Sequence, residues 1–189
     1  RIVDQRTVPD PALGSRPVGR TDEDCLYLDV RTPRADDGRR PVMVWVYGGG
    51  FSGGWGGDPL FAGNHLVARG DVVLVTFSYR LGVLGFGHIE APNVGLADQI
   101  AALEWVSANV AAFGGDPDDV TLFGESAGAM SAFALAACPA ADGLFHRLIA
   151  QSGACTGVQS EASAARAREL LGDALGTRDP ERWRRYETE

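Results

Sequence analysis

The sequence lacks the features that direct a chain to a membrane or to a polyanion. No apolar run approaches the roughly 20 residues that a membrane-spanning helix needs, and the longest, around residues 72–77, has the length of a buried strand. Basic residues are outnumbered, since 17 Lys and Arg face 25 Asp and Glu, for a formal net charge of -8. A nucleic acid or an anionic lipid needs clustered positive charge on its partner. We therefore expect a soluble protein with no nucleic-acid partner and no membrane-spanning segment.

Cysteine is also scarce. The three cysteines, Cys25, Cys138 and Cys155, form an odd set without metal-like spacing, which argues against a disulfide scaffold and against a zinc site. We expect buried free thiols, no metal and no cofactor. The chain begins at Arg1 without a methionine, a basic leader or an apolar leader, so we expect the true start to lie upstream. The compartment, cytoplasmic or secreted, and the oligomeric state therefore stay open.

What is present is an ordinary globular composition, with 45% hydrophobic and 22% charged residues over 189 positions. Residues 1–22 are rich in Pro, Gly and charge and show no period, so we interpret them as an N-terminal loop or remnant. Strand-like and helix-like patterns then alternate. Strands are predicted at 26–30, 42–47, 72–78, 120–123 and 148–151, and helices at 96–110, 127–137 and 162–175. This alternation predicts an α/β fold with a mostly parallel, doubly wound sheet.

Residues 124–128 have the pattern G-x-S-x-G and fall between a predicted strand and a predicted helix. This position is the context of a nucleophile elbow. The turn is so tight that its flanking residues must be small, and it lifts the Ser126 hydroxyl to the carboxyl edge of the sheet, at the start of a helix. In a chain with 25 glycines the pattern alone could arise by chance, so its position is what indicates a nucleophile.

Three successive glycines, Gly48–Gly50, follow the second predicted strand. Acyl transfer places negative charge on the former carbonyl oxygen, and backbone N–H groups reach that oxygen only where no side chain blocks the approach. We interpret the three glycines as an oxyanion-hole loop of the kind found in lipases and esterases. The alternative, a plain flexible turn, stays open for residues 53–54 and 56–57.

Six segments carry a more specific resemblance, within a match that spans about residues 23–153. They are residues 23–30, 47–51, 78–82, 93–99, 113–117 and 124–128. Together they resemble the type-B carboxylesterase and cholinesterase family, whose members have the α/β-hydrolase fold. The resemblance implies that Ser126 is the nucleophile of a carboxylic ester hydrolase and that Glu125 is a buried carboxylate beside it. It also implies an oxyanion hole made of the N–H groups of Gly49, Gly50 and Ala127.

Two further matching positions are interpreted as structural. Arg80 and Asp98 are expected to form a buried ion pair that fixes the loop after the third strand, with a surface role for either as the alternative. In many relatives the cysteine at the position of Cys25 bonds to an upstream cysteine. No cysteine precedes Cys25 here, so the expectation is a free thiol, with a lost partner as the alternative.

A serine nucleophile needs a base and an acid that orients the base, and in this fold they follow in the order Ser, Asp or Glu, His. Only His146 follows Ser126. The helix at 127–137 carries the chain about 16 Å away, to the opposite edge of the sheet, so His146 is excluded as the base. His65 and His88 precede the serine and break the order. We expect both partners beyond residue 189, which makes residues 1–189 a partial domain that is nearly inert alone.

Two alternatives to this interpretation stay open. The first is a catalytically inactive, cholinesterase-like binding or adhesion module that keeps the fold. Such relatives typically lose the nucleophile, whereas Ser126 and the glycine loop are present, so the sequence favours an enzyme with a small-molecule ester substrate. The second keeps the enzyme class but replaces the substrate with amides, carbamates or long-chain lipids.

Overall fold

The structure is a computed structural model and describes residues 22–88, 91–155 and 159–183. The expected N-terminal loop lies outside this part of the chain apart from Asp22. The strands are β1 (Leu28–Arg31), β2 (Arg40–Val46), β3 (Val73–Phe77), β4 (Gly115–Glu125) and β5 (Arg147–Gln151). The helices are α1 (Asn64–Gly70), α2 (Gly82–Phe86), α3 (Val94–Asn109), α4 (Ala127–Ala136), α5 (Glu161–Leu175) and α6 (Pro180–Trp183), with single 3-10 turns η2 (Pro59–Phe61), η3 (Val110–Phe113) and η4 (Pro139–Ala141).

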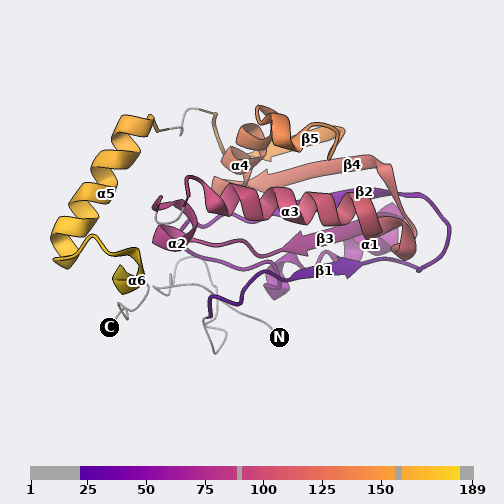
Figure 1. The fold of residues 1–189 in the computed structure, drawn as a ribbon. Helices are drawn as coiled ribbons and strands as arrows, with labels where there is room; N and C mark the ends of the chain where they lie inside the picture. The colour runs from indigo at the N-terminus through magenta and orange to yellow at the C-terminus, as the bar shows by residue number, and fades with distance from the viewer. Residues whose placement is uncertain (1–21, 89–90, 156–158, 184–189) are drawn as a thin grey trace.

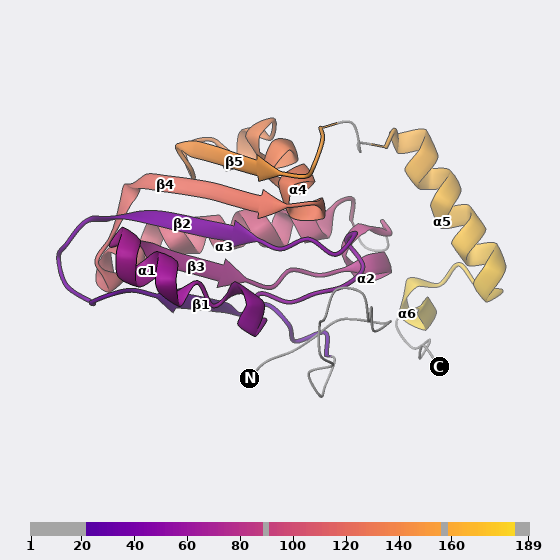
Figure 2. The same cartoon turned by 180° about the vertical axis from the view of Figure 1, so that it is seen from behind.

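The five strands form one sheet in the order β1-β3-β2-β4-β5, seen from its two sides in Figures 1 and 2. β2 is parallel to β3 and β4, β4 is parallel to β5, and β1 runs antiparallel to β3. The predicted α/β fold with a mostly parallel sheet is therefore confirmed. We call the side of the sheet where β2, β3, β4 and β5 end its carboxyl end, and the side where they begin its amino end.

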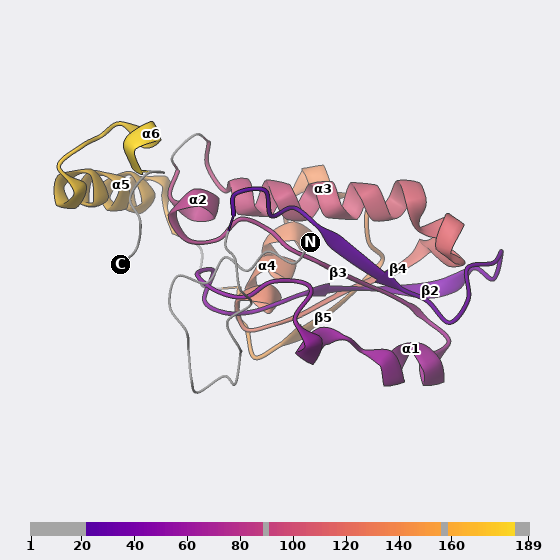
Figure 3. The ribbon, with the colours of Figure 1, turned by 90° about the horizontal axis from the view of Figure 1, so that it is seen from below.

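Helices cover both faces of the sheet, as Figure 3 shows: α3 and α4 lie on one face and α1 on the other. Parallel neighbours require such crossover connections, because the chain must return to the start of the sheet before each new strand. A buried hydrogen bond from Gln99 Nε2 to Ser131 Oγ, 3.1 Å long, joins α3 to α4. α5 lies beyond the carboxyl end, near α2 (Figure 1).

The core sits between the central strands and these helices. All five residues of β3 are buried, as expected for a strand covered on both faces. In β2, fully buried residues alternate with partly exposed ones. α4 consists mainly of small residues, and five of these are buried together with Leu135. This composition lets the helix approach the sheet closely. The buried hydrophobic cluster includes Val44, Val75, Leu103, Leu122 and Leu135.

The sequence patterns predicted the five strands and the long helices but missed the short helices. α1 and α2 have seven and five residues, which is too short for a helical period of apolar residues to be recognised. β4 begins at Gly115, five residues before the predicted start at residue 120, because Gly115 pairs with Arg40 across an irregularity in the ladder. The residues in between are mostly polar, so no alternation marked them as a strand.

Candidate active site

Ser126 occupies a strained turn between β4 and α4. Its backbone has φ 54° and ψ −120°, a conformation that costs a non-glycine residue roughly 1–3 kcal/mol. Two backbone hydrogen bonds hold it there. The Ser126 N–H donates to the Gln151 carbonyl at 2.9 Å, and the Met130 N–H donates to the Ser126 carbonyl at 3.0 Å. The end of β5 and the first turn of α4 therefore fix the direction of the serine.

The glycines around Ser126 are required by close backbone contacts. A methyl group at Gly124 would lie 2.6 Å from the carbonyl carbon of Gly128, and one at Gly128 would lie 2.0 Å from the Val46 oxygen. The prediction that small residues flank the serine is confirmed in these two contacts. The sequence did not indicate a third requirement at Gly153, where a methyl group would lie 2.7 Å from the backbone carbonyl oxygen of Ser126.

The glycine turn after β2 has a defined shape. Gly49, Gly50 and Phe51 all have positive φ, at 108°, 61° and 60°. The Gly49 carbonyl accepts hydrogen bonds from the N–H groups of Ser52 and Gly53, each at 3.1 Å. A methyl group at Gly49 would lie 2.3 Å from the Gly53 oxygen. The backbone therefore closes on itself here, and a side chain at position 49 would prevent it from doing so.

The glycine turn and the serine meet at the carboxyl end. Val46 pairs with Gly124 in the sheet. Gly48 lies beside Ser126, and each comes two residues after its member of that pair. A methyl group at Gly48 would lie 3.1 Å from Ser126 Cβ. Within the part of the chain that the structure describes, the N–H groups of Gly49, Gly50 and Ala127 have no hydrogen-bond acceptor. The last of these heads α4, where the helix dipole adds partial positive charge.

One expectation for this site is wrong. The resemblance implies that Glu125 is buried, yet Glu125 is exposed. It is the last residue of β4 and pairs with Gln151, which is also exposed, on the terminal strand of the described sheet. No further described strand covers this side. Glu125 Oε2 still lies 3.0 Å from where a methyl group at Gly48 would be, so the carboxylate stays beside the glycine turn.

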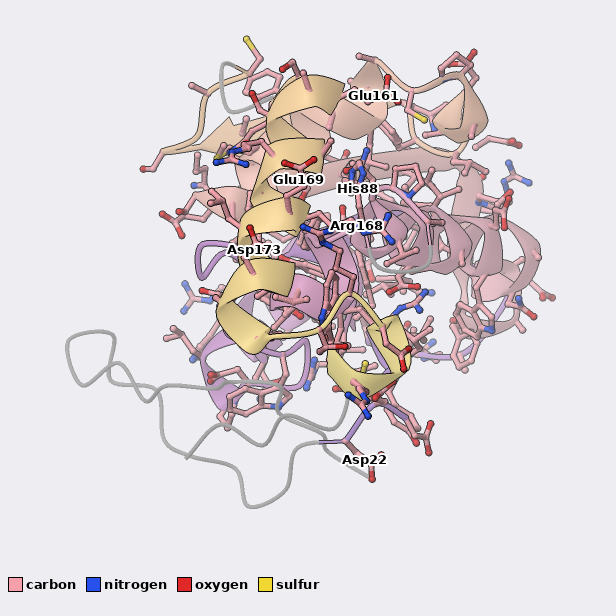
Figure 4. All side chains as sticks on the ribbon, turned by 60° about the vertical axis from the view of Figure 1, so that its left-hand side comes forward. Asp22, His88, Glu161, Arg168, Glu169 and Asp173 are labelled. Carbon is pink, nitrogen blue, oxygen red and sulfur yellow. The ribbon has the colours of Figure 1, made fainter. Side chains whose placement is uncertain are left out.

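The three histidines lie in different parts of the fold. His146 Nδ1 accepts a hydrogen bond from the Val120 N–H at 3.1 Å, and Val120 comes six residues before Ser126 in β4, about 20 Å away for an extended chain. His65 belongs to α1, which leads to the start of β3. His88 follows α2, at the side of the molecule where α5 lies. It can be found in Figure 4, where Arg168 and Glu169 of α5 are also labelled. Among the described residues, no histidine hydrogen-bonds to Ser126.

The predicted ion pair between Arg80 and Asp98 is present. Arg80 Nε and Nη2 donate to the two carboxylate oxygens at 2.8 and 2.7 Å, and the Arg80 N–H donates to Oδ2 at 3.0 Å. The Asp98 side chain is 5% exposed and that of Arg80 is 28% exposed, so only the acid is fully buried. The loop held in this way reaches the glycine turn, because the Gly82 N–H donates to the Phe51 carbonyl at 2.6 Å.

Two groups near this end of the sheet did not enter the predicted site. Tyr47 and Tyr79 are buried and bond to each other's backbone; the signal in the sequence is a tyrosine just beyond the end of each of two neighbouring strands. Of the three free cysteines only Cys25 is buried, so the expectation of buried thiols is wrong for Cys138, which is partly exposed, and for Cys155, which is exposed. Burial raises the pKa of Cys25 to about 11, and the nearby Asp98 carboxylate acts in the same direction.

Two wider features of the described residues bear on function. None of their helices combines the length and the apolar character needed to cross a membrane. None of their His, Cys, Asp and Glu side chains gather in threes or more in a way that could hold a metal ion.

The chain is similar to known proteins over most of its length. The profile described as "Carboxylesterase family" matches residues 4–182. The para-nitrobenzyl esterase of Bacillus subtilis (strain 168) is 49% identical over 158 residues, which are 80% of this chain and 32% of that protein. The acetylcholinesterase of Gallus gallus is 49% identical over 162 residues, which are 82% of this chain and 21% of that protein. The chain thus spans a third or less of the length of these relatives.

Solved structures show the same likeness in three dimensions. A thermophilic PNB esterase superposes with a TM-score of 0.87 at 44% identity, over 94% of this chain and 38% of that one. A carboxylesterase of Geobacillus stearothermophilus gives a TM-score of 0.82 at 44% identity, over 87% of this chain and 36% of that one. The arrangement of strands and helices described above is therefore shared with these esterases.

Proposed function

This chain belongs to the carboxylesterase family, and on that premise we propose that it supplies the nucleophile and the oxyanion hole of an enzyme that hydrolyses carboxylic esters. Ser126 is the nucleophile in this proposal. The N–H groups of Gly49, Gly50 and Ala127 are the oxyanion donors. Para-nitrobenzyl esterase and acetylcholinesterase are both named for the cleavage of an ester, which supports the same bond as the target here.

The observation that carries the proposal is the contact between the glycine turn and the serine. A methyl group at Gly48 would lie 3.1 Å from Ser126 Cβ, so the serine side chain starts next to the turn that contains two of the donors. The third donor, the Ala127 N–H, belongs to the residue after the serine. Because none of the three N–H groups has an acceptor among the described residues, all are available to an oxygen that develops charge.

The reaction follows from this arrangement. Ser126 Oγ attacks the ester carbonyl carbon as its proton passes to a base, and the carbonyl π electrons move to the oxygen. The three N–H groups stabilise the resulting oxyanion. Collapse of this intermediate breaks the bond to the alkoxy oxygen, which leaves as the alcohol after taking the proton from the base. Water then attacks the acyl-enzyme in the same way, which releases the acid and restores the serine.

The base and the acid are assigned to polypeptide outside residues 1–189. His146 is engaged at the amino end of the sheet, and His65 and His88 precede the serine in the chain, against the order of this fold. Without a base the serine hydroxyl is a poor nucleophile. Residues 1–189 alone should retain no more than the roughly 10³-fold acceleration over water that an oxyanion hole and substrate binding can give.

The proposal is tested by an assay of two proteins with a short-chain aryl ester: residues 1–189 alone, and the same chain extended to the length of its relatives. The extended protein should turn over, and Ser126→Ala should abolish its activity. Ser107→Ala, at an exposed position of α3, is the matched serine control and should leave the activity unchanged. Equal and substantial turnover by both wild-type proteins would contradict the assignment of the base.

A fluorophosphonate probe separates the enzyme from an inactive binding module. The probe reacts covalently with an activated serine, so mass spectrometry of the extended protein should locate the adduct on Ser126. The Ser126→Ala variant should remain unlabelled, and the Ser107→Ala variant should react like wild type. An extended, folded protein that neither reacts with the probe nor hydrolyses esters would favour the binding module instead.

A further inference from the structure

Tyr47 and Tyr79 stand beyond the ends of two neighbouring parallel strands and bond to each other's backbone. The Tyr79 hydroxyl donates to the Tyr47 carbonyl at 2.9 Å, and the Tyr47 hydroxyl donates to the Tyr79 carbonyl at 3.3 Å. The Tyr79 N–H also donates to the Tyr47 hydroxyl oxygen at 3.4 Å. The last pair in the ladder between β2 and β3 is Trp45 with Thr76. The two tyrosines therefore continue the pairing with their side chains where the backbone ladder stops.

The tyrosine pair is buried and closely packed. The two rings stack with their centroids 4.5 Å apart and an interplanar angle of 22°, and the residues are 1% and 0% exposed. Burial raises the pKa of Tyr79, so its hydroxyl keeps its proton and remains a donor at neutral and mildly alkaline pH. Because water does not reach this site, it cannot replace the bond from Tyr79 to the Tyr47 carbonyl.

The Tyr47 carbonyl is the last peptide oxygen before the glycine turn. It shares a rigid peptide plane with the Gly48 N–H, so the bond from Tyr79 fixes the direction in which the turn starts. The same oxygen would lie 2.9 Å from a methyl group at Gly128, in the first turn of α4. The return arm of the turn rests on the Tyr47 ring, since a methyl group at Gly54 would lie 2.7 Å from it. The Tyr47 peptide thus contacts both the glycine turn and the helix that follows Ser126.

We infer that Tyr79 is a positioning residue for the oxyanion hole: by holding the Tyr47 carbonyl, it sets the orientation of the peptide groups that carry the Gly49 and Gly50 N–H donors. The inference rests on the proposed function, because those donors matter only if an oxyanion forms beside Ser126. Tyr79 is buried, so in this inference it acts through the Tyr47 carbonyl and not by contact with the substrate. Donors that point away from the oxyanion stabilise the transition state less and leave ground-state binding of the ester unchanged.

The test uses Tyr79→Phe in the chain extended to the length of its relatives. This substitution keeps the stacked ring and removes the hydroxyl. We expect kcat to fall about tenfold with KM within about twofold of wild type. The affinity for a trifluoromethyl ketone, which forms a tetrahedral adduct with an active serine, should weaken by the same factor as kcat/KM. If Tyr79 had a role in packing alone, the substitution would lower the melting temperature, and the loss of inhibitor affinity would not match the loss of kcat/KM.

Two further proteins keep the test decisive. Val120→Ala is the stability control, because it removes buried methyl groups at the amino end of the sheet. It should lower the free energy of unfolding and leave kcat and inhibitor affinity unchanged. If Tyr79→Phe fails to fold, 4-fluorophenylalanine at position 79 fills the space of the hydroxyl without a proton to donate. It should show the same parallel loss.

The outcomes are separable. If the wild-type extended protein hydrolyses esters and the variants at position 79 match it within twofold in kcat and inhibitor affinity, the inference is overturned and the proposed function stands. A fall in kcat without a parallel loss of inhibitor affinity also overturns it. If the wild-type extended protein is folded and hydrolyses no ester, the proposed function fails, and the role of Tyr79 fails with it.

Discussion

The carboxyl end of the sheet is constrained by close backbone contacts around Ser126, whereas the amino end also carries ion pairs with exposed side chains. At the carboxyl end, Ser126, Gly49 and Gly50 have positive φ, and added methyl groups at several glycines would collide with backbone atoms. At the amino end, Arg39 pairs with Asp116 at 2.8 Å, with the Arg39 side chain 66% exposed. Backbone atoms cannot move aside for a new group, while exposed side chains can. The two ends should therefore respond very differently to substitution.

The largest difference is expected in catalysis. Ser126→Ala in the extended protein should reduce kcat/KM for an aryl ester by at least about 10⁴-fold, because it removes the attacking oxygen. His146→Ala, at the amino end, should leave kcat/KM within twofold of wild type. Steady-state kinetics on both variants measure this contrast. A large loss in His146→Ala that is not explained by unfolding would break the comparison, since it would make the distant histidine part of the reaction.

The next largest effect concerns glycine. Gly128→Ala places a methyl group 2.0 Å from the Val46 oxygen, so the free energy of unfolding should fall by about 3 kcal/mol or more. Gly70→Ala, in the last turn of α1, brings its methyl group no closer than 3.5 Å to Val72. It should stabilise the protein by about 0.5 kcal/mol. Urea denaturation compares them, and equal effects would show that the carboxyl end is no more constrained than the amino end.

Ion pairs at the two ends should differ less, but in the same direction. Asp98→Asn removes the charge from a buried carboxylate that binds Arg80 through three hydrogen bonds. We expect a loss of about 2–3 kcal/mol, somewhat less than for a fully buried pair because Arg80 is partly exposed. Arg39→Ala breaks an exposed pair and should cost less than about 1 kcal/mol. The same urea titrations provide the values; a larger loss in Arg39→Ala would reverse the ranking.

A pH dependence is also expected near the carboxyl end. Above about pH 9 the unfolded chain loses the Cys25 proton first, because burial raises the pKa of this thiol to about 11 in the folded protein. The free energy of unfolding should therefore fall between about pH 9 and pH 11, by about 1–2 kcal/mol from Cys25. Cys25→Ala should flatten this part of the profile. An identical slope in the variant would show that the thiol does not contribute.

Much of the fold could be predicted because its long elements follow simple periods. The apolar runs that became β2 and β3 and the helical spacing that became α3 needed no knowledge of the tertiary structure. The G-x-S-x-G segment and the three glycines each follow a predicted strand, and parallel strands end on the same side of a sheet. The sequence therefore also predicted that the serine and the glycine turn lie close together. The short helices α1 and α2 have no such period and were missed.

What the sequence could not supply are contacts between distant residues. In the sequence, nothing distinguishes Gly153 from other glycines. In the structure, a methyl group there would lie 2.7 Å from the backbone carbonyl oxygen of Ser126. The reciprocal bonds of Tyr47 and Tyr79 depend on the register of β2 and β3. Glu125 shows the converse limit: a resemblance implied its burial, but burial depends on which other parts of the polypeptide lie over the residue.

The account depends on the Ser126 hydroxyl and the N–H groups of Gly49, Gly50 and Ala127 facing one point. The most direct test is a crystal structure of the extended protein with a phosphonate bound covalently to Ser126, since the phosphonyl oxygen mimics the oxyanion. We predict that this oxygen lies about 2.7–3.1 Å from the three backbone nitrogens. A phosphonyl oxygen directed away from the glycine turn, or an adduct on another residue, would contradict the account.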